Sequence, residues 1–174
     1  MYSSRWCLSK PRLVSVVIAL SFPVFCFANA TLQNSSVMAT STIISLTNID
    51  RGALGLDDLR SNNKLEKAAQ LKANDMASRG YFSHNTPEGK KPWYWFKLAG
   101  YNFNYAGENL AVNFSKPSDM ENAWMNSPGH KANIVNVHFK EIGIGIAYGT
   151  YNGQPATFVV ELFGAEPVKA VATR

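Results

Sequence analysis

The fold of this chain is decided by the stretch Ile142-Gly143-Ile144-Gly145-Ile146-Ala147. Isoleucine alternates there with glycine and alanine, and a repeat of two residues is the period of a β-strand, because successive side chains point to opposite faces. One face of this predicted strand is apolar, and the other is nearly flat. A flat face allows a helix or a ligand to approach the strand backbone closely.

A second strand is predicted directly after the first. Asn152-Gly153 lies in the connection, and this dipeptide favours a tight hairpin turn because both residues tolerate positive φ. The segment Thr157-Phe158-Val159-Val160-Glu161-Leu162-Phe163 that follows is rich in β-branched and aromatic residues. The two strands are therefore predicted to pair as an antiparallel hairpin.

Helical signals fill the chain before the hairpin. The clearest predicted helix covers residues 64–79, with Asn63 as its N-cap, Glu66 completing a capping box and Gly80 as its left-handed stop. Further helices are predicted at 43–53 and 92–99, and two more begin at the predicted N-caps Ser118 and Ser127. Helices first and strands last are typical of an α+β fold, with helices packed on an antiparallel sheet.

The first thirty residues have the composition of a secretory signal peptide. A basic region is followed by the apolar residues 13–27, and Ala28-Asn29-Ala30 is a small-x-small cleavage site. An uncleaved membrane anchor is the alternative, but the apolar run is shorter than the ~20 residues that a span needs, and Pro23 interrupts it. We therefore expect a protein that is secreted or periplasmic, with no stable membrane anchor.

The predicted organisation is one domain with short flanking segments. Residues 1–30 are the signal peptide, 31–42 a flexible Ser/Thr/Asn-rich lead-in, 43–166 the folded domain and 167–174 a frayed tail. Cleavage would lower the formal charge from +5 to +2, since Arg5, Lys10 and Arg12 leave and no acid does. So small a charge indicates no nucleic-acid partner.

Both cysteines also belong to the predicted signal peptide. Cys7 and Cys26 would leave with it, so the mature chain is expected to fold without a disulfide. Cys26 could instead carry a lipid anchor. We reject that alternative because the bulky Phe25 stands where a small residue is expected.

Two histidines and one glutamate are the candidate site residues: His84, Glu108 and His130. Imidazole and carboxylate groups hold divalent transition metals, and they transfer protons near neutral pH. On residue types alone, hydrogen-bonded histidines with a purely structural role are an equal alternative. The three residues lie in the segments Tyr81-Phe82-Ser83-His84, Gly107-Glu108-Asn109-Leu110-Ala111 and Ser127-Pro128-Gly129-His130.

Together these segments resemble the CAP superfamily, named for cysteine-rich secretory proteins, antigen 5 and pathogenesis-related 1 proteins. Its bacterial SCP-like branch is the most similar. The resemblance covers about residues 43–164 and includes Asn48-Ile49-Asp50-Arg51, Trp124 and Ile142-Gly143-Ile144-Gly145. It implies a secreted protein with a three-layer α-β-α sandwich, a central antiparallel sheet and an open cleft.

In that family two histidines and two acidic residues line the cleft, and some members bind a divalent metal there. His84 and His130 match the histidines and are the metal ligands that the resemblance implies, while Glu108 matches the first acid. Ser127 stands where the second acid belongs, three residues before His130. Because a hydroxyl is a poor metal ligand, we expect Zn²⁺ or another divalent cation to bind only weakly.

Ser127 and Glu108 also have roles that need no ligand. As an N-cap, Ser127 would accept a backbone N–H near His130. A serine nucleophile with His130 as its base is disfavoured, because the chain has no Gly-x-Ser-x-Gly elbow. Glu108 is expected at a turn after Gly107, where it would cap or bridge backbone groups.

The leading functional prediction is a secreted CAP-type binding module that engages an extracellular protein, glycan or lipid through its cleft. The first alternative is a protease-like, metal-assisted hydrolase with Glu108 as general base and water on a metal at His84 and His130. The second is an inert structural domain of the cell envelope. No catalytic residue is assigned beyond the candidate Glu108, because a fold by itself does not determine an activity.

Overall fold

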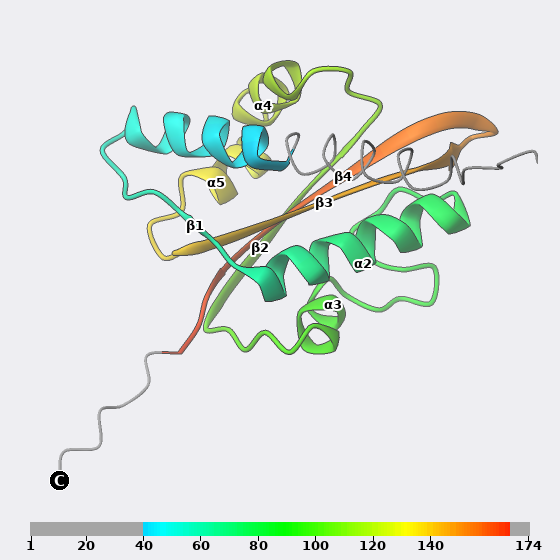
Figure 1. Ribbon diagram of the computed structural model, residues 1–174, viewed down its shortest axis with the longest axis horizontal. Helices are drawn as coiled ribbons and strands as arrows, with labels where there is room; N and C mark the ends of the chain where they lie inside the picture. Colours follow the sequence, from blue (N-terminus) through cyan, green and yellow to red (C-terminus); the bar gives the residue numbers. More distant parts are fainter. Residues whose placement is uncertain (1–39, 168–174) are drawn as a thin grey trace, which may run out of the picture.

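The computed structural model describes residues 40–167, which form a sheet between two layers of helices (Figure 1). The predicted signal peptide, both cysteines, most of the lead-in and all but one residue of the predicted tail lie outside the described residues. No helix within 40–167 is long and apolar enough to cross a membrane.

The sheet has four strands in the order β1-β3-β4-β2. The long strands pair antiparallel, β3 with β4 and β4 with β2, as predicted for the hairpin, but β1 pairs with β3 in parallel, so the sheet is mixed. Asn152 and Gly153 form the turn with φ of 52° and 74°, which confirms the predicted turn chemistry. The strands are β1 (Arg60–Ser61), β2 (Tyr105–Val112), β3 (Glu141–Tyr151) and β4 (Gln154–Ala165).

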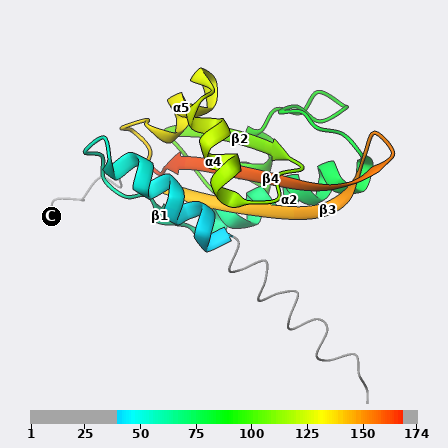
Figure 2. The ribbon, with the colours of Figure 1, turned by 90° about the horizontal axis from the view of Figure 1, so that it is seen from above.

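Helices cover both faces of this sheet (Figures 1 and 2). One apolar cluster joins α2 and α3 to one face, and a second joins the first helix, α4 and α5 to the other face. The predicted α+β fold with three layers is therefore confirmed. The helices are the first helix, at 40–52, α2 (Asn63–Arg79), α3 (Trp93–Leu98), α4 (Pro117–Met125) and α5 (Pro128–Ile134).

The two faces of β3 explain the layers. A Cβ on Gly143 would overlap the backbone of Leu65, and one on Gly145 would overlap the backbone of Ala69, so α2 lies directly on the glycine face. The isoleucines of the opposite face belong to the second apolar cluster. The flat face predicted from the sequence is thus the surface on which α2 packs.

Helix starts differ from the predictions by one to three residues. Residues 40–42, expected in the flexible lead-in, are helical, because the buried Ile43 packs this helix in the second cluster. The cap of α2 is Asn62, not Asn63, since Asn62 is extended and its side chain accepts the N–H groups of Lys64 and Leu65. Helix α4 begins at Pro117 rather than after Ser118, because proline is favoured in the first turn.

The stop of α2 is as predicted. Gly80 adopts φ of 67° and donates its N–H to the Met76 carbonyl. The buried side of α2 consists mostly of alanines, which let the helix lie close to β3, and it also includes a lysine. Its buried residues are Leu65, Ala68, Ala69, Lys72, Ala73, Met76 and Ala77.

Candidate functional site

The three candidate residues come from three different elements. His84 lies in the loop after α2, His130 is in α5, and Glu108 is in β2, at one edge of the sheet. The turn expected at Glu108 is wrong, because Glu108 pairs with Leu162 in the middle of the β2–β4 ladder. The adjacent polar residues Glu108 and Asn109 hide the alternating apolar pattern that would have indicated a strand.

His84 and Glu108 are joined directly. The Nδ1 atom of His84 lies 2.6 Å from Oε1 of Glu108. The Glu108 side chain is 2% exposed and the His84 side chain 57% exposed, so the bond joins a buried carboxyl group to an exposed ring. With Nδ1 engaged, Nε2 is the nitrogen of His84 that remains for a ligand.

The hydrogen bond and burial shift the pKa values of both groups. The hydrogen bond to Glu108 raises the pKa of His84, against the opposing effect of burial. Burial raises the pKa of Glu108, although the hydrogen bond from His84 and the charge of Lys72 oppose that change. The other oxygen of Glu108, Oε2, is buried and has no hydrogen-bond partner among the described residues.

Lys72 holds the loop that carries His84. Its fully buried Nζ donates to the carbonyl of Ser83 at 2.7 Å and to that of His84 at 2.8 Å. Burial lowers the pKa of Lys72, while the charge of Glu108 opposes this change. Lys72 is one of the buried residues of α2. The available signal was a charged residue within an otherwise apolar stripe.

His130 favours the neutral form. Burial and, to a smaller extent, the charge of His84 lower its pKa. The position of His130 near the start of α5 also favours a neutral imidazole, because the N-terminus of a helix disfavours positive charge. Burial is the larger cause. The two histidines therefore influence each other electrostatically, although they belong to different elements.

Two asparagines connect the strand to α5. The Asn109 amide donates to the His130 carbonyl at 3.3 Å. The Asn133 amide donates to the Glu108 carbonyl at 3.0 Å and to Oδ1 of Asn109 at 2.9 Å. These contacts fix α5 against β2, and the sequence analysis did not identify them. The sequence signal for these contacts is only that Asn109 directly follows the candidate residue Glu108.

Ser127 occupies the N-cap position of α5 with an extended backbone, as predicted, but its side chain makes no capping hydrogen bond. The predicted capping contact is therefore wrong. Within residues 40–167, no three side chains of His, Cys, Asp or Glu lie close enough together to form a metal site. His84 and Glu108 bond to each other instead.

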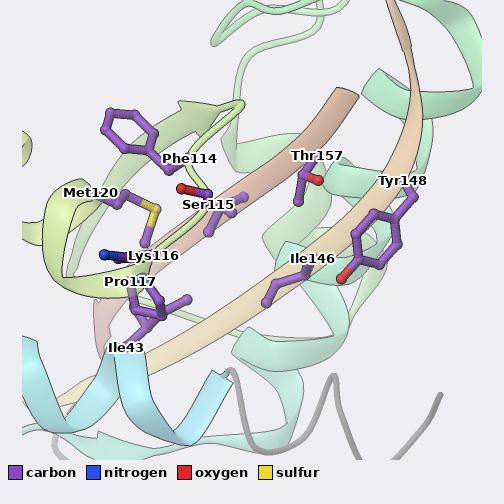
Figure 3. A pocket seen from close by; sticks show the side chains of 10 residues that line it. Ile43, Phe114, Ser115, Lys116, Pro117, Met120, Ile146, Tyr148 and Thr157 are labelled. Atoms are coloured by element: carbon purple, nitrogen blue, oxygen red, sulfur yellow. The ribbon is translucent and has the colours of Figure 1, made fainter. Parts of the chain in front are cut away.

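A separate apolar cavity of about 270 Å³ lies between the first helix, the start of α4 and the sheet (Figure 3). None of the candidate site residues lines it. Its lining is mainly apolar, with several polar groups at Ser115, Lys116 and Thr157. The apolar side chains come from Ile43, Phe114, Pro117, Met120, Ile146, Tyr148 and Val159.

Comparison with known proteins gives concordant matches. The family model described as "CAP: Cysteine-rich secretory protein family" matches residues 44–163, which include every candidate site residue. YkwD of Bacillus subtilis (strain 168) is 36% identical over 125 residues, which are 68% of this chain and 49% of YkwD. The chain thus spans about half the length of that relative.

Solved structures agree with the family match. An extracellular protein with an SCP domain from Bacillus anthracis str. Ames has a TM-score of 0.62 and 28% identity, covering 74% of this chain and 40% of that one. An outer surface protein from Borrelia burgdorferi has a TM-score of 0.63 and 26% identity, covering 73% and 92% of the two chains. The chain therefore belongs to the CAP family of cysteine-rich secretory proteins.

Proposed function

We propose that this chain is a secreted CAP-type binding module in which His84 and His130 bind a divalent cation such as Zn²⁺ weakly. The observation that carries the proposal is the 2.6 Å hydrogen bond from His84 Nδ1 to the buried Glu108. A carboxylate bonded to one ring nitrogen commonly orients a histidine whose other nitrogen binds metal. Glu108 would then orient His84, and the two imidazoles would be the protein ligands.

The lowered pKa of His130 supports the same proposal, because it keeps the imidazole neutral, and neutral imidazole is the form that binds metal. A solved structure of the same fold, NaASP2, is described with Zn²⁺. Its identity to this chain is 13%, so that likeness concerns the fold, and the residues of this chain carry the proposal.

The hydrolase alternative has weaker support. A general base must reach the water that it activates. The Glu108 side chain is 2% exposed, and its Oε1 is already bonded to His84. We therefore favour binding over catalysis, with an extracellular protein, glycan or lipid as the ligand class.

Among those ligand classes, the cavity of Figure 3 favours a lipid as a second candidate. Its volume of about 270 Å³ and apolar lining suit a narrow acyl chain rather than a hydrated glycan. Met120→Glu would place a charge on the lining and should abolish binding of a fluorescent fatty acid. Unchanged fatty-acid binding by that variant would exclude the cavity as the lipid site.

Isothermal titration of the exported protein with zinc tests the main proposal. Wild type should bind at neutral pH, and His84→Ala and His130→Ala should each lose binding. Glu108→Gln should weaken binding by roughly 10- to 100-fold, as loss of an orienting carboxylate does. His138→Ala is the matched control, because His138 is exposed and its ring stacks on Tyr105. Absence of zinc binding by wild type would refute the metal proposal.

A further inference from the structure

Two carboxyl groups are buried on the face of the sheet opposite α2. Glu121 of α4 is 3% exposed, and Glu161 of β4 is 0% exposed. Thr47 of the first helix lies between them. Its hydroxyl oxygen is 2.9 Å from Oε1 of Glu161 and 3.5 Å from Oε2 of Glu121. It is also 3.1 Å from the Ile43 carbonyl.

The number of protons at this cluster is limited by its geometry. A threonine hydroxyl has one proton, so it cannot donate to three acceptors at once. If Glu121 keeps its own proton, it can donate to the Thr47 oxygen while Thr47 donates to Glu161. Oε1 of Glu121 is buried with no hydrogen-bond partner among the described residues, which suits a neutral carboxyl group better than a carboxylate.

Among residues 40–167, the groups that face the pair supply no balancing positive charge. The first helix contributes Asp50 and Thr47, and β2 contributes the Asn109 amide, which donates to Oε2 of Glu161 at 3.0 Å. In the part of the chain that the structure describes, neither glutamate forms an ion pair with a lysine or arginine. From β3, Ile144 pairs with Glu161 and adds only apolar surface.

These surroundings disfavour two negative charges. Burial, the charge of Glu161 and the charge of Asp50 raise the pKa of Glu121 to about 9. Burial raises the pKa of Glu161 to about 7. Both pKa values are thus raised, as expected if the pair keeps a proton of its own in addition to the single proton of the Thr47 hydroxyl.

The pair is also connected to the candidate site. The same Asn109 amide that donates to Glu161 donates to the carbonyl of His130. A change in the charge of Glu161 therefore acts on a side chain that holds α5 against the sheet. Because α5 carries His130, the connection extends from the buried pair to one of the two histidines.

We propose that Glu121 and Glu161 share one proton, and that the singly protonated pair holds α4 and, through Asn109, His130 of α5 in place. Loss of that proton in alkaline solution leaves two adjacent carboxylates in an apolar layer, and their repulsion loosens both helices. This inference concerns residues outside the candidate site. It does not depend on whether the site binds metal.

The pH range follows from the sign of the two pKa shifts. Both folded-state values lie above the ordinary value of 4.5. The pair therefore holds two protons in acid, one between about pH 7 and about pH 9, and none above that range. The stability that each proton contributes is fully present below about pH 4.5 and is lost as pH rises through the folded-state pKa of its group, so the shared proton is the one lost near pH 9.

Thermal unfolding of the exported protein between pH 5 and 9.5 tests the shared proton. Glu121→Gln and Glu161→Gln keep the shape of a neutral carboxyl group without the titration. Each should raise the melting temperature at pH 9 by roughly 5 °C or more relative to wild type. Glu166→Gln is the control, because Glu166 is exposed just after β4, and its pH profile should match that of wild type. Profiles of the two buried variants that match wild type would overturn the proposal.

Carbon-13 NMR of the carboxyl groups in wild type gives a measurement that needs no variant to fold. Two glutamate signals should titrate far above the ordinary glutamate range, and the side-chain amide signals of Asn109 should move at the same pH. Titration of every glutamate near 4.5 would refute the shared proton. An Asn109 amide that stays unchanged while the pair titrates would refute the connection to His130. Failure to bind zinc would refute only the metal proposal.

Discussion

His84 Nδ1 lies 2.6 Å from Oε1 of Glu108, although 24 positions separate the two residues in the chain. The bond connects an exposed loop to the interior of an edge strand. It also determines which nitrogen of the imidazole can bind a ligand, because Nδ1 is engaged and only Nε2 remains available. The properties of the candidate site therefore depend on how firmly the loop after α2 is held against β2.

Zinc affinity should rise between pH 6 and pH 8. A metal must displace protons from imidazole, and the raised pKa of His84 extends that competition above the ordinary histidine range. Calorimetry at pH 6, 7 and 8 in buffers of different ionisation enthalpy would measure the affinity and the protons released. An affinity that is independent of pH would exclude imidazole ligands.

Ser127→Glu should strengthen zinc binding, because it restores a carboxylate at the position of the family's second acid. The cost in stability should stay below the ~1 kcal/mol of a lost N-cap, since the Ser127 side chain makes no capping bond. Ser127→Gln, with a similar shape and no charge, is the matched control. Equal affinities of the two variants would show that this position does not reach the metal.

Lys72→Met should weaken zinc binding and destabilise the protein by about 1–3 kcal/mol, because two carbonyls of the His84 loop lose their donor. Urea unfolding and zinc titration would measure both effects. Lys67→Met, at an exposed position of the same helix, should change neither. If Lys72→Met left zinc affinity unchanged, Lys72 would have no part in positioning His84.

Gly145→Ala should destabilise the fold by roughly 3 kcal/mol, since its Cβ would overlap the backbone of Ala69 and backbone cannot repack as a side chain can. Gly52→Ala is the control, because nothing lies within 4 Å of the added Cβ in the first helix. That variant should be neutral or stabilised by about 0.5–1 kcal/mol. Chemical denaturation of the two variants would compare them directly.

The exported protein should begin near Thr31, with cleavage after Ala28 as the nearby alternative. Either cut removes Cys7 and Cys26, so dithiothreitol should not change the melting temperature. N-terminal sequencing and melting with and without reductant would check both points. A membrane-bound product that retains Met1 would contradict the predicted export.

The parts of the fold that follow from local chemistry could be predicted from the sequence. The alternation in residues 142–147 predicts β3 and its flat face, Asn152-Gly153 predicts the turn, and Gly80 predicts the end of α2. Each signal lies within a few neighbouring residues, where backbone sterics and side-chain periodicity act directly. The motifs also identified His84, Glu108 and His130 as candidates, and the structure joins two of them, His84 and Glu108, by a hydrogen bond.

Only the tertiary structure decided how those residues are used. Strand β2 could not be predicted from the sequence, because two adjacent polar residues, Glu108 and Asn109, interrupt its apolar pattern. The two side chains face opposite sides of the sheet, where Glu108 bonds to His84 and Asn109 donates to Glu161. Thr47 meets Glu121 and Glu161 across 74 and 114 positions of the chain. Such contacts depend on strand register and on which helix covers which face. Local sequence therefore determined the elements and the candidate residues, whereas the packing of the layers decided which polar groups meet.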